Sequence, residues 1–312
     1  MRSLLAIAGM TRAEIEGLLD RAQSFAEGAS AASWTGKTVV NLFLEPSTRT
    51  RVSFEIAAKR LGASVVNVSQ QASSMVKGES LADTARTLDA MTPDVIVMRH
   101  AFSGSVEYLD AHVRASVVNA GDGQHEHPTQ GLLDALTIRR AKGRVEGLKV
   151  AIVGDIRHSR VARSNVHCLT RLGARVAVFG PATLVPPGFE ALGARVADSL
   201  EDALDRADVV MALRIQKERM EEAFLPSTKE YALGFRIDAA RLGAAKRDVL
   251  VMHPGPMNRG VEITDAVADG PSSAITDQVA NGVFVRMAVL DEVLRARDAG
   301  AAAVKRQKRR AG

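Results

Sequence analysis

Cysteine, aromatic residues and long apolar runs are all scarce in this chain of 312 residues. The one cysteine, Cys168, allows no disulfide within the chain, so we expect a protein of a reducing compartment, the cytoplasm. Aromatic residues make up 4%, too few for a platform on which nucleic-acid bases stack. Apolar runs such as Val95–Met98 are far shorter than the ~20 residues of a membrane span, and Leu4–Ile7 is too short for a secretory signal. We therefore expect neither a membrane protein nor a secreted one.

The formal net charge of +5 arises in the last residues of the chain. The basic residues there are Lys305, Arg306, Lys308, Arg309 and Arg310. They are five of the 41 Lys and Arg residues, so the rest of the chain balances its 36 Asp and Glu residues. A short basic run at a chain end is usually frayed and solvated, the alternative being a segment that binds RNA or an acidic partner. Nucleic acid is therefore not expected as the main partner.

Short apolar strands alternate with helical patterns along the whole chain. The predicted strands are Val39–Leu44, Ser64–Val68, Asp94–Arg99, Ser116–Asn119, Lys149–Val153, Arg175–Phe179, Val209–Leu213 and Val249–Met252. The predicted helices are Thr11–Glu27, Arg51–Leu61, Leu81–Met91, Thr129–Lys142, Val161–Leu172, Leu200–Ala207 and Ala280–Arg297. Nearly all-apolar strands between helices are typical of parallel sheets covered on both faces. We predict an α/β fold of two domains, residues 1–143 plus 276–312 and residues 144–275, each a parallel sheet flanked by helices, with the C-terminal helix returning to the first domain.

Candidate ligand groups follow the predicted strands of the first domain, where parallel sheets bind their ligands. After the first strand, the hydroxyls of Ser47, Thr48 and Thr50 and the guanidinium of Arg49 precede a helix, an arrangement suited to a phosphate. The Gly-rich Walker pattern is absent, so a nucleoside triphosphate is not implied. Arg99 adds a cation at the end of another strand. The structural alternatives are a capped helix start and an arginine in a surface ion pair.

His125 and His127 follow the fourth predicted strand. Alternate residues of an extended segment face the same side, so the two histidines are one candidate for a metal pair. No cysteine and no further histidine at ligand spacing completes a metal site. Pro128 instead favours a helix start that directs His127 and Gln130 towards the edge of the sheet. We predict a hydrogen-bonding role for His127 and no metal.

The second predicted sheet lacks the glycines of a dinucleotide site but has several arginines. Lys149–Val153 is not followed by Gly-x-Gly-x-x-Gly, so NAD is not expected. Arg160 after that strand, and Arg214 and Gln216 after a later one, suit a dicarboxylate, with solvated loop arginines as the alternative. The last strand ends in His253–Pro256, which is either a plain turn or a rigid one whose carbonyl groups are available to a ligand.

Four motifs, in this order, resemble one enzyme family. They are Ser47-Thr48-Arg49-Thr50-Arg51, His127-Pro128-Thr129-Gln130, Arg214-Ile215-Gln216-Lys217-Glu218-Arg219 and His253-Pro254-Gly255-Pro256. From about Thr11 to Arg297 the sequence is similar to the aspartate/ornithine carbamoyltransferases, and among them to the aspartate-specific catalytic chains. Ornithine-specific members carry a His-Cys-Leu-Pro motif near the end, whereas the corresponding turn here has no cysteine. The resemblance implies carbamoyl transfer from carbamoyl phosphate to the amine of L-aspartate, a step of de novo pyrimidine biosynthesis, with ornithine or an ornithine derivative as the alternative acceptor.

The resemblance also implies a role for each motif residue. Carbamoyl phosphate would contact Ser47, Thr48, Arg49, Thr50, Arg99, His127, Gln130, Pro254, Gly255 and Pro256. L-Aspartate would contact Arg160, Arg214 and Gln216, together with Ser73 and Lys77 from the neighbouring subunit of a homotrimer. The catalytic residues would be Arg49, Thr50, Arg99 and His127, in a direct acyl transfer that needs no metal, cofactor or covalent intermediate. The first domain would then bind carbamoyl phosphate and the second would bind aspartate.

The sequence leaves further partners and other function classes open. The resemblance allows a regulatory chain or a dihydroorotase-like partner. An anion-binding module without catalytic activity, or one that binds nucleic acid through the basic tail, is the alternative of a different class. A metal hydrolase built on His125 and His127 is another.

Overall fold

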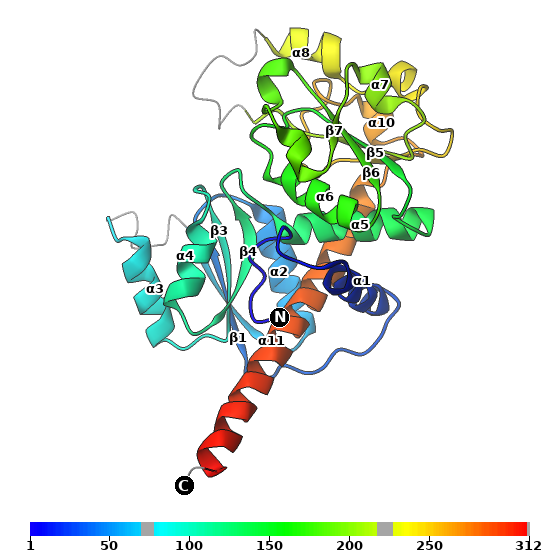
Figure 1. The fold of residues 1–312 in the computed structure, drawn as a ribbon. Helices are drawn as coiled ribbons and strands as arrows, with labels where there is room; N and C mark the ends of the chain where they lie inside the picture. Colours follow the sequence, from blue (N-terminus) through cyan, green and yellow to red (C-terminus); the bar gives the residue numbers. More distant parts are fainter. Residues whose placement is uncertain (70–77, 217–226, 311–312) are drawn as a thin grey trace. The chain divides into compact units, whose positions relative to one another are not determined.

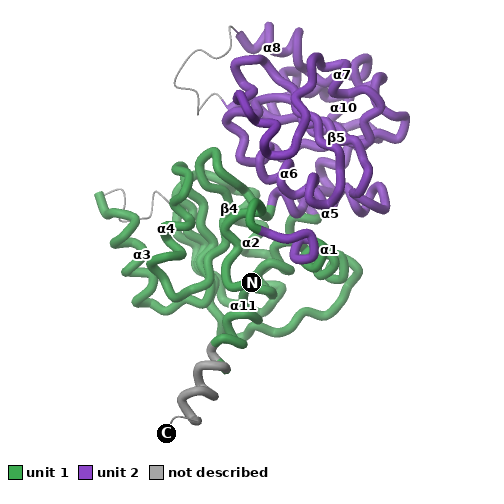
Figure 2. Tube along the Cα trace, in the orientation of Figure 1, with its two compact units in different colours: residues 1–9, 16–129, 281–312 green, residues 10–15, 130–280 purple. Residues whose placement is uncertain are grey.

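Two parallel sheets organise the chain, each in a compact unit of its own (Figures 1 and 2). The computed structural model describes residues 1–69, 78–216 and 227–310, without the side chains of residues 301 and 303–310. Unit 1 comprises Met1–Gly9, Glu16–Thr129 and Asn281–Gly312, and unit 2 comprises Met10–Ile15 and Gln130–Ala280. The predicted fold class, two parallel sheets flanked by helices, is confirmed. How the two binding functions divide along the chain stays a prediction.

The sheet of unit 1 has the strand order β2-β1-β3-β4. Its strands are β1 (Thr38–Phe43), β2 (Ser64–Ser69), β3 (Val95–His100) and β4 (Ser116–Asp122). Its helices are α1 (Arg12–Ala26), α2 (Thr48–Arg60), α3 (Leu81–Ala90), α4 (Ser105–His112) and most of α11 (Ile275–Arg310). Apolar residues of β1, β3 and β4 pack under α3 and α4 in one core cluster. Figure 1 shows α2 and α11 on the other side of this sheet.

The sheet of unit 2 has the strand order β7-β6-β5-β8-β9. Its strands are β5 (Lys149–Val153), β6 (Arg175–Phe179), β7 (Arg195–Val196), β8 (Val209–Ala212) and β9 (Leu250–Met252). Its helices are α5 (Pro128–Lys142), α6 (Arg160–Arg171), α7 (Leu200–Leu204), α8 (Thr228–Phe235), α9 (Ala239–Leu242) and α10 (Asp265–Ala268), with 3-10 turns η3 (Ala182–Leu184) and η4 (Phe189–Leu192).

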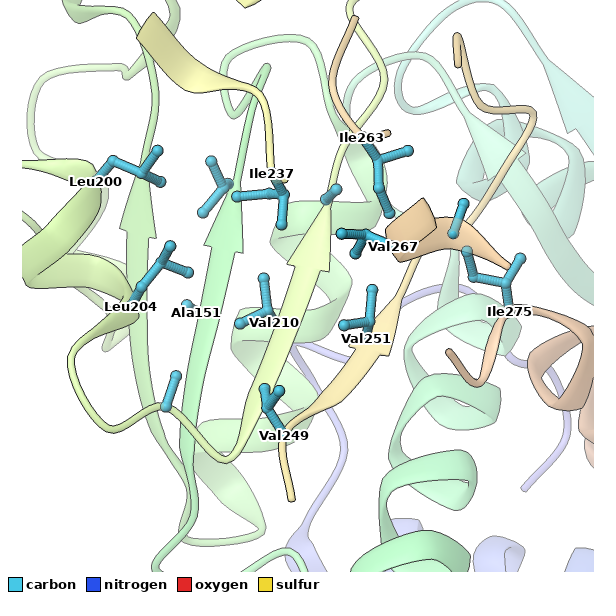
Figure 3. Packing of buried hydrophobic residues seen from close by; sticks show 14 residues of the cluster. Ala151, Leu200, Leu204, Val210, Ile237, Val249, Val251, Ile263, Val267 and Ile275 are labelled. Atoms are coloured by element: carbon cyan, nitrogen blue, oxygen red, sulfur yellow. The ribbon is translucent and has the colours of Figure 1, made fainter. Parts of the chain in front are cut away.

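The core on one face of this second sheet is built from three strands and two short helices (Figure 3). Val210 of β8 and Val251 of β9 lie among the side chains of Leu204 from α7 and Val267 from α10. Burying side chains of this size contributes ~1.5–3 kcal/mol each. The core therefore fixes the strands whose ends carry the predicted ligand groups.

Helix α2 begins earlier than the sequence predicted. We expected it to start at Arg51, but it starts at Thr48, because Ser47 is extended (φ −162°) and acts as the N-cap residue. The residues that we placed in a loop, Thr48, Arg49 and Thr50, instead form the first helical turn. Helix geometry gives the N–H groups of a first turn no acceptor within the helix. Besides its hydroxyl groups, this segment therefore offers backbone N–H groups to a ligand.

The C-terminal helix returns to unit 1, as predicted. The buried carboxylate of Asp291 in α11 accepts a hydrogen bond from Nε1 of Trp34 and pairs with Arg21, both at 3.0 Å. The helix is longer than the predicted Ala280–Arg297, since its backbone stays helical to Arg310, through the tail that we expected to fray. In the part of the chain that the structure describes, no helix combines the length and the apolar character needed to cross a bilayer.

Several elements escaped prediction because they carry little periodicity. Helices α9 and α10 have four residues each, and strand β7 has two. Helices α4 and α8, with eight residues each, mix polar and apolar residues without a strong apolar stripe. None of these elements changes which strand ends carry the ligand groups.

The close packing of α5 against α6 can be tested by its effect on stability. A Cβ atom added at Gly131 would lie 2.9 Å from the carbonyl oxygen of Ser164, whereas one at Gly17 in α1 would meet nothing within 4 Å. Gly131→Ala should therefore lower the melting temperature by several degrees through overpacking at ~1–3 kcal/mol. Gly17→Ala, the matched control, should raise it by roughly 2 °C through helix propensity. Differential scanning calorimetry of both variants checks this, and shifts of the same sign would contradict it.

Candidate active site

Each sheet has one point at which the strand order reverses. In unit 1 the chain passes from β1 to β2 on one side and then to β3 on the other. In unit 2 it passes from β5 to β6 and β7, and then to β8 on the opposite side. Such switch points leave a crevice at the carboxyl ends of the strands, where α/β proteins bind ligands. Predicted ligand groups follow β1, β3, β5 and β8, the strands that flank these points, and further ones follow β4 and β9.

The segment after β1 presents hydrogen-bond donors at a helix start. Ser47 makes no capping hydrogen bond with its side chain, Thr48 and Arg49 are exposed, and Thr50 is buried. Helix N-termini favour anions through their N–H groups and the helix dipole, and an arginine adds a planar, bidentate donor. The first turn of α2 is therefore suited to a phosphate group.

Arg99 lies across the switch point of unit 1, opposite the end of β1. The β1–β3 register pairs Phe43 with Arg99, which brings Glu45 beside the guanidinium. Nε of Arg99 lies 3.1 Å from Oε2 of Glu45, and Nη1 donates to the carbonyl oxygen of Ala120 at 3.3 Å. The Arg99 side chain is 14% exposed. The two contacts hold a largely buried cation at the crevice.

The segment between β4 and α5 is held by buried carboxylates. Glu126 is 1% exposed and accepts hydrogen bonds from the N–H groups of Ile7 and Ala8, both at 2.9 Å. His127 is buried as well, and Pro128 occupies the first position of α5, one residue before the predicted start. A proline fits there because the first N–H of a helix needs no partner within it.

The two histidines of this segment have different environments. Among the described residues, the one group close enough to share a metal ion is Glu107, Asp122 and His125, without His127. The oxygens of Asp122 already accept hydrogen bonds from the side chain of Asn119 (2.7 Å) and from backbone N–H groups. The geometry therefore does not support the alternative of a metal hydrolase built on His125 and His127.

In unit 2 a buried carboxylate joins the loops after β5 and β8. Asp155 is fully buried and accepts hydrogen bonds from Nδ1 of His158 (3.0 Å) and from the N–H of Gln216 (3.2 Å). The side-chain amide of Gln216 donates in turn to the carbonyl oxygen of His158 at 3.1 Å. At Gly154 (φ +139°) a Cβ would lie 2.5 Å from the carbonyl oxygen of Leu213, so this glycine permits the close approach of the two strand ends.

Three of the predicted aspartate ligands lie around this junction: Arg160, Arg214 and Gln216. Arg160 is the first residue of α6, buried at 3% exposure and preceded by the N-cap Ser159, whose Oγ accepts from the N–H of Ala162. Arg214 and Gln216 follow β8 and are half-buried. Ser73 and Lys77 lie outside the described residues.

Hydrogen bonds with buried groups of the protein hold the His253–Pro256 turn in place. Nδ1 of His253 accepts the N–H of Gly255 (2.8 Å), and Nε2 lies 3.2 Å from the buried carboxylate of Glu262. The backbone N–H of His253 donates to Oε1 of Gln278 at 2.9 Å. With its own donors engaged inside the protein, the turn is suited to offer carbonyl oxygens.

Comparison with known proteins agrees with this arrangement. Residues 2–140 match the family domain described as "Aspartate/ornithine carbamoyltransferase, carbamoyl-P binding domain", and residues 146–293 match the corresponding "Asp/Orn binding domain". The chain belongs to the aspartate/ornithine carbamoyltransferase family. The match covers both units and all four sequence motifs.

Members of this family with established names resemble the chain over almost its whole length. It is 62% identical to the aspartate carbamoyltransferase catalytic subunit of Sorangium cellulosum (93% of this chain, 92% of that protein) and 58% identical to that of Bradyrhizobium diazoefficiens (94% and 95%). The aspartate transcarbamoylase of Trypanosoma cruzi, solved with carbamoyl phosphate, superposes with a TM-score of 0.83 at 36% identity (94% and 96%). The ornithine carbamoyltransferase of Pyrococcus furiosus gives 0.85 at 32% (94% and 97%).

Sequence reasoning missed several polar residues that contact the predicted ligand groups or the loops that carry them. Glu45 and Asp155 each lie two residues after the end of a strand, a position that already marks a candidate. Asp134, one helical turn after Gln130, and Gln278 gave no such signal. Their relevance depends on contacts with residues that are distant in the sequence.

The pair of His125 and Asp122 gives unit 1 a pH-dependent stability. Burial opposes ionisation of Asp122, but hydrogen bonds from His125, Asn119 and the N–H of Gly104 outweigh it and lower its pKa. The same hydrogen bond is the main cause that raises the pKa of His125 above its ordinary value, against the effect of burial. Protonated His125 therefore stabilises the folded state.

We expect His125→Gln to lose stability mainly at low pH. The contribution of a raised histidine pKa is complete below the unfolded value of about 6.5 and is lost as the pH rises through the higher folded value. The difference in melting temperature between wild type and variant should thus be largest near about pH 6 and shrink towards about pH 9. The control is His112→Gln, because the ring of His112 faces the carbonyl oxygen of Tyr108 (2.7 Å) and not a carboxylate. A difference that does not change with pH would refute the assignment.

Proposed function

We propose that the chain transfers the carbamoyl group of carbamoyl phosphate to the amine of L-aspartate, giving N-carbamoyl-L-aspartate and phosphate, a step of de novo pyrimidine biosynthesis. The observation that carries this proposal is the placement of two sets of anion-binding groups, one at the switch point of each sheet, in a chain with both family domains. The substrates are water-soluble, and we place the reaction in the cytoplasm.

Sequence similarity, not fold, favours aspartate as the acceptor. The ornithine enzyme of Pyrococcus furiosus superposes as well as the aspartate enzymes do, so the fold does not discriminate. The relatives at 62% and 58% identity are both aspartate carbamoyltransferases. Arg160 and Arg214 supply positive charge to the junction in unit 2, which suits the carboxylates of aspartate and opposes the ammonium of ornithine.

In the proposed reaction the aspartate amine attacks the carbamoyl carbon, the bond to the phosphate oxygen breaks, and phosphate leaves with the proton that the amine gives up. Ser47, Thr48, Arg49 and Thr50 bind the phosphate group in unit 1. Thr50, Arg99 and His127 donate hydrogen bonds to the oxygen on which negative charge develops, each worth ~3–4 kcal/mol if typical of such donors. Gln130 and the carbonyl groups of Pro254, Gly255 and Pro256 bind the remaining part of carbamoyl phosphate. The contact of Arg99 with Glu45 supports its role, because it orients the guanidinium before substrate binds.

The proposed function implies a strict choice of acceptor. Purified protein should release phosphate from carbamoyl phosphate with L-aspartate and not with L-ornithine. Arg214→Ala should raise the KM for aspartate by roughly 30-fold or more, because removing one partner of a buried charge pair costs ~2–5 kcal/mol. The control Arg236→Ala removes an arginine of unit 2 whose Nη2 lies 3.9 Å from Asp238 and outside the proposed pocket. Wild-type kinetics for Arg214→Ala, or turnover of ornithine, would contradict the acceptor assignment.

We further propose a homotrimer in which Ser73 and Lys77 of one subunit complete the aspartate pocket of the next. Exposed apolar side chains on α2 and β2 support an interface at this part of unit 1. Val52 (41% exposed) and Ile56 (38%) lie one turn apart on α2, and Val66 (49%) lies on the edge strand β2. Strand β2 leads directly into the segment that carries Ser73 and Lys77.

A hybrid experiment tests the shared site. Homogeneous Arg49→Ala and Lys77→Ala proteins should both be nearly inactive. After the two are unfolded, mixed in equal amounts and reassembled, a site formed by a Lys77→Ala subunit with an Arg49→Ala neighbour contains both groups. In a cyclic trimer about a quarter of the sites should then recover. An inactive mixture in which native mass spectrometry detects hybrid trimers would place Lys77 outside the neighbour's site.

The relatives are named catalytic subunits, and this name favours a further chain as a partner of this protein. A regulatory chain and a dihydroorotase-like enzyme are the two candidates. Copurification from the native host separates them, because a regulatory chain brings no second catalytic activity whereas a dihydroorotase-like enzyme does.

A further inference from the structure

A buried carboxylate in unit 2 lies behind the groups proposed to bind the carbamoyl end of the substrate. Asp134 of α5 is fully buried, and so is Asn165 of α6. Gln130 and Gln278, from the starts of α5 and α11, are 8% and 3% exposed. The absence of a side chain at Gly131 allows α5 to approach α6 closely at this level. The four polar side chains form one network.

All three amide groups donate to the Asp134 carboxylate. Its Oδ1 accepts from Nε2 of Gln130 at 2.9 Å and from Nε2 of Gln278 at 2.7 Å. Its Oδ2 accepts from Nδ2 of Asn165 at 2.7 Å. An ionised carboxylate can only accept hydrogen bonds, so each amide must turn its NH₂ group towards it.

Because the NH₂ group of each glutamine is bound to Asp134, its carbonyl oxygen is the atom that can accept a hydrogen bond from another group. Gln278 directs its Oε1 to the backbone N–H of His253, the residue that begins the Pro254–Pro256 turn. Gln130, with its NH₂ group bound to Asp134, has its carbonyl oxygen left to offer to a ligand. A flipped Gln130 would bring its oxygen against the carboxylate oxygen, which is repulsive. Asp134 therefore makes Gln130 an acceptor and, through Gln278, holds a turn that offers carbonyl oxygens.

We propose that Asp134 is a positioning residue that gives the site its specificity for the amine of carbamoyl phosphate. This inference rests on the proposed function, since it assigns the acceptors to the NH₂ group of that substrate. The carbamoyl NH₂ is a hydrogen-bond donor, and only acceptors recognise it. A site built to bind an NH₂ group rejects an analogue that lacks it, because its polar groups are then left unpaired. Acetyl phosphate, in which a methyl group replaces the amine, is such an analogue.

The experiment compares the binding of the two phosphates in the absence of aspartate, so that no turnover is needed. Isothermal titration calorimetry at low temperature gives the dissociation constants of carbamoyl phosphate and acetyl phosphate. Asp134→Ala should weaken carbamoyl phosphate by about tenfold or more, and acetyl phosphate by less than about threefold. Asp134→Asn keeps a carbonyl oxygen for Gln130 and should restore the preference to within about threefold of wild type.

Two further variants separate positioning from general stability. Asn165→Ala removes the hydrogen bond to Oδ2 of Asp134, which is as long (2.7 Å) as the one from Gln278 to Oδ1. It should therefore lower the melting temperature but leave the preference for carbamoyl phosphate over acetyl phosphate unchanged. Gln278→Met removes both hydrogen bonds of that side chain at similar volume, and it should reduce the preference even if Asp134→Ala does not fold.

Equal weakening of both phosphates in Asp134→Ala, an unchanged preference in Gln278→Met, or a wild type that does not distinguish the two phosphates would overturn the inference. Turnover of the wild type with aspartate is measured in parallel. A wild type that prefers carbamoyl phosphate but transfers nothing contradicts the proposed function and not the role of Asp134.

Discussion

Buried carboxylates that accept two or more hydrogen bonds hold the loops at the carboxyl edges of both sheets. Glu126 fixes the N-terminal segment in unit 1, and Asp155 joins two strand-end loops in unit 2. A buried charge is costly unless it is paired or fully hydrogen-bonded, so each of these acids constrains the groups that surround it. Loops that would otherwise sample many conformations are thereby restricted to one arrangement. The anion-binding groups depend on this restriction.

The same logic explains how the site keeps cations in place before an anion arrives. Burying a guanidinium without a partner costs desolvation free energy. A guanidinium on a mobile loop would lose conformational entropy when it binds an anion. Arg99 avoids both costs through its contacts with Glu45 and the carbonyl oxygen of Ala120. Preorganised donors of this kind need no rearrangement when charge develops on the substrate. Glu45, which sequence reasoning passed over, therefore orients a cation that it identified.

Local patterns predicted the framework well where an element is long or fully apolar. Strands β5 and β6 have the predicted bounds, and the helix after His127 begins at Pro128, one residue before the predicted start. The start of α2 was misplaced because Thr and Arg next to a proline-containing loop give a weak helical signal, whereas the extended Ser47 decides the cap. Two-residue and four-residue elements such as β7 and α9 have no period to detect.

The sequence by itself determined the alternation of strands and helices, and therefore which side chains follow which strand ends. It also carried the four motifs that indicate the family, because the residues of each motif are neighbours along the chain. Only the tertiary structure decided which of these ends flank a switch point, since that depends on strand order. It also decided the supporting contacts, such as those of Glu45 with Arg99 and of Asp134 with Gln278. Such pairs join residues far apart in the sequence, and packing of the sheets and helices, not any local pattern, brings them together.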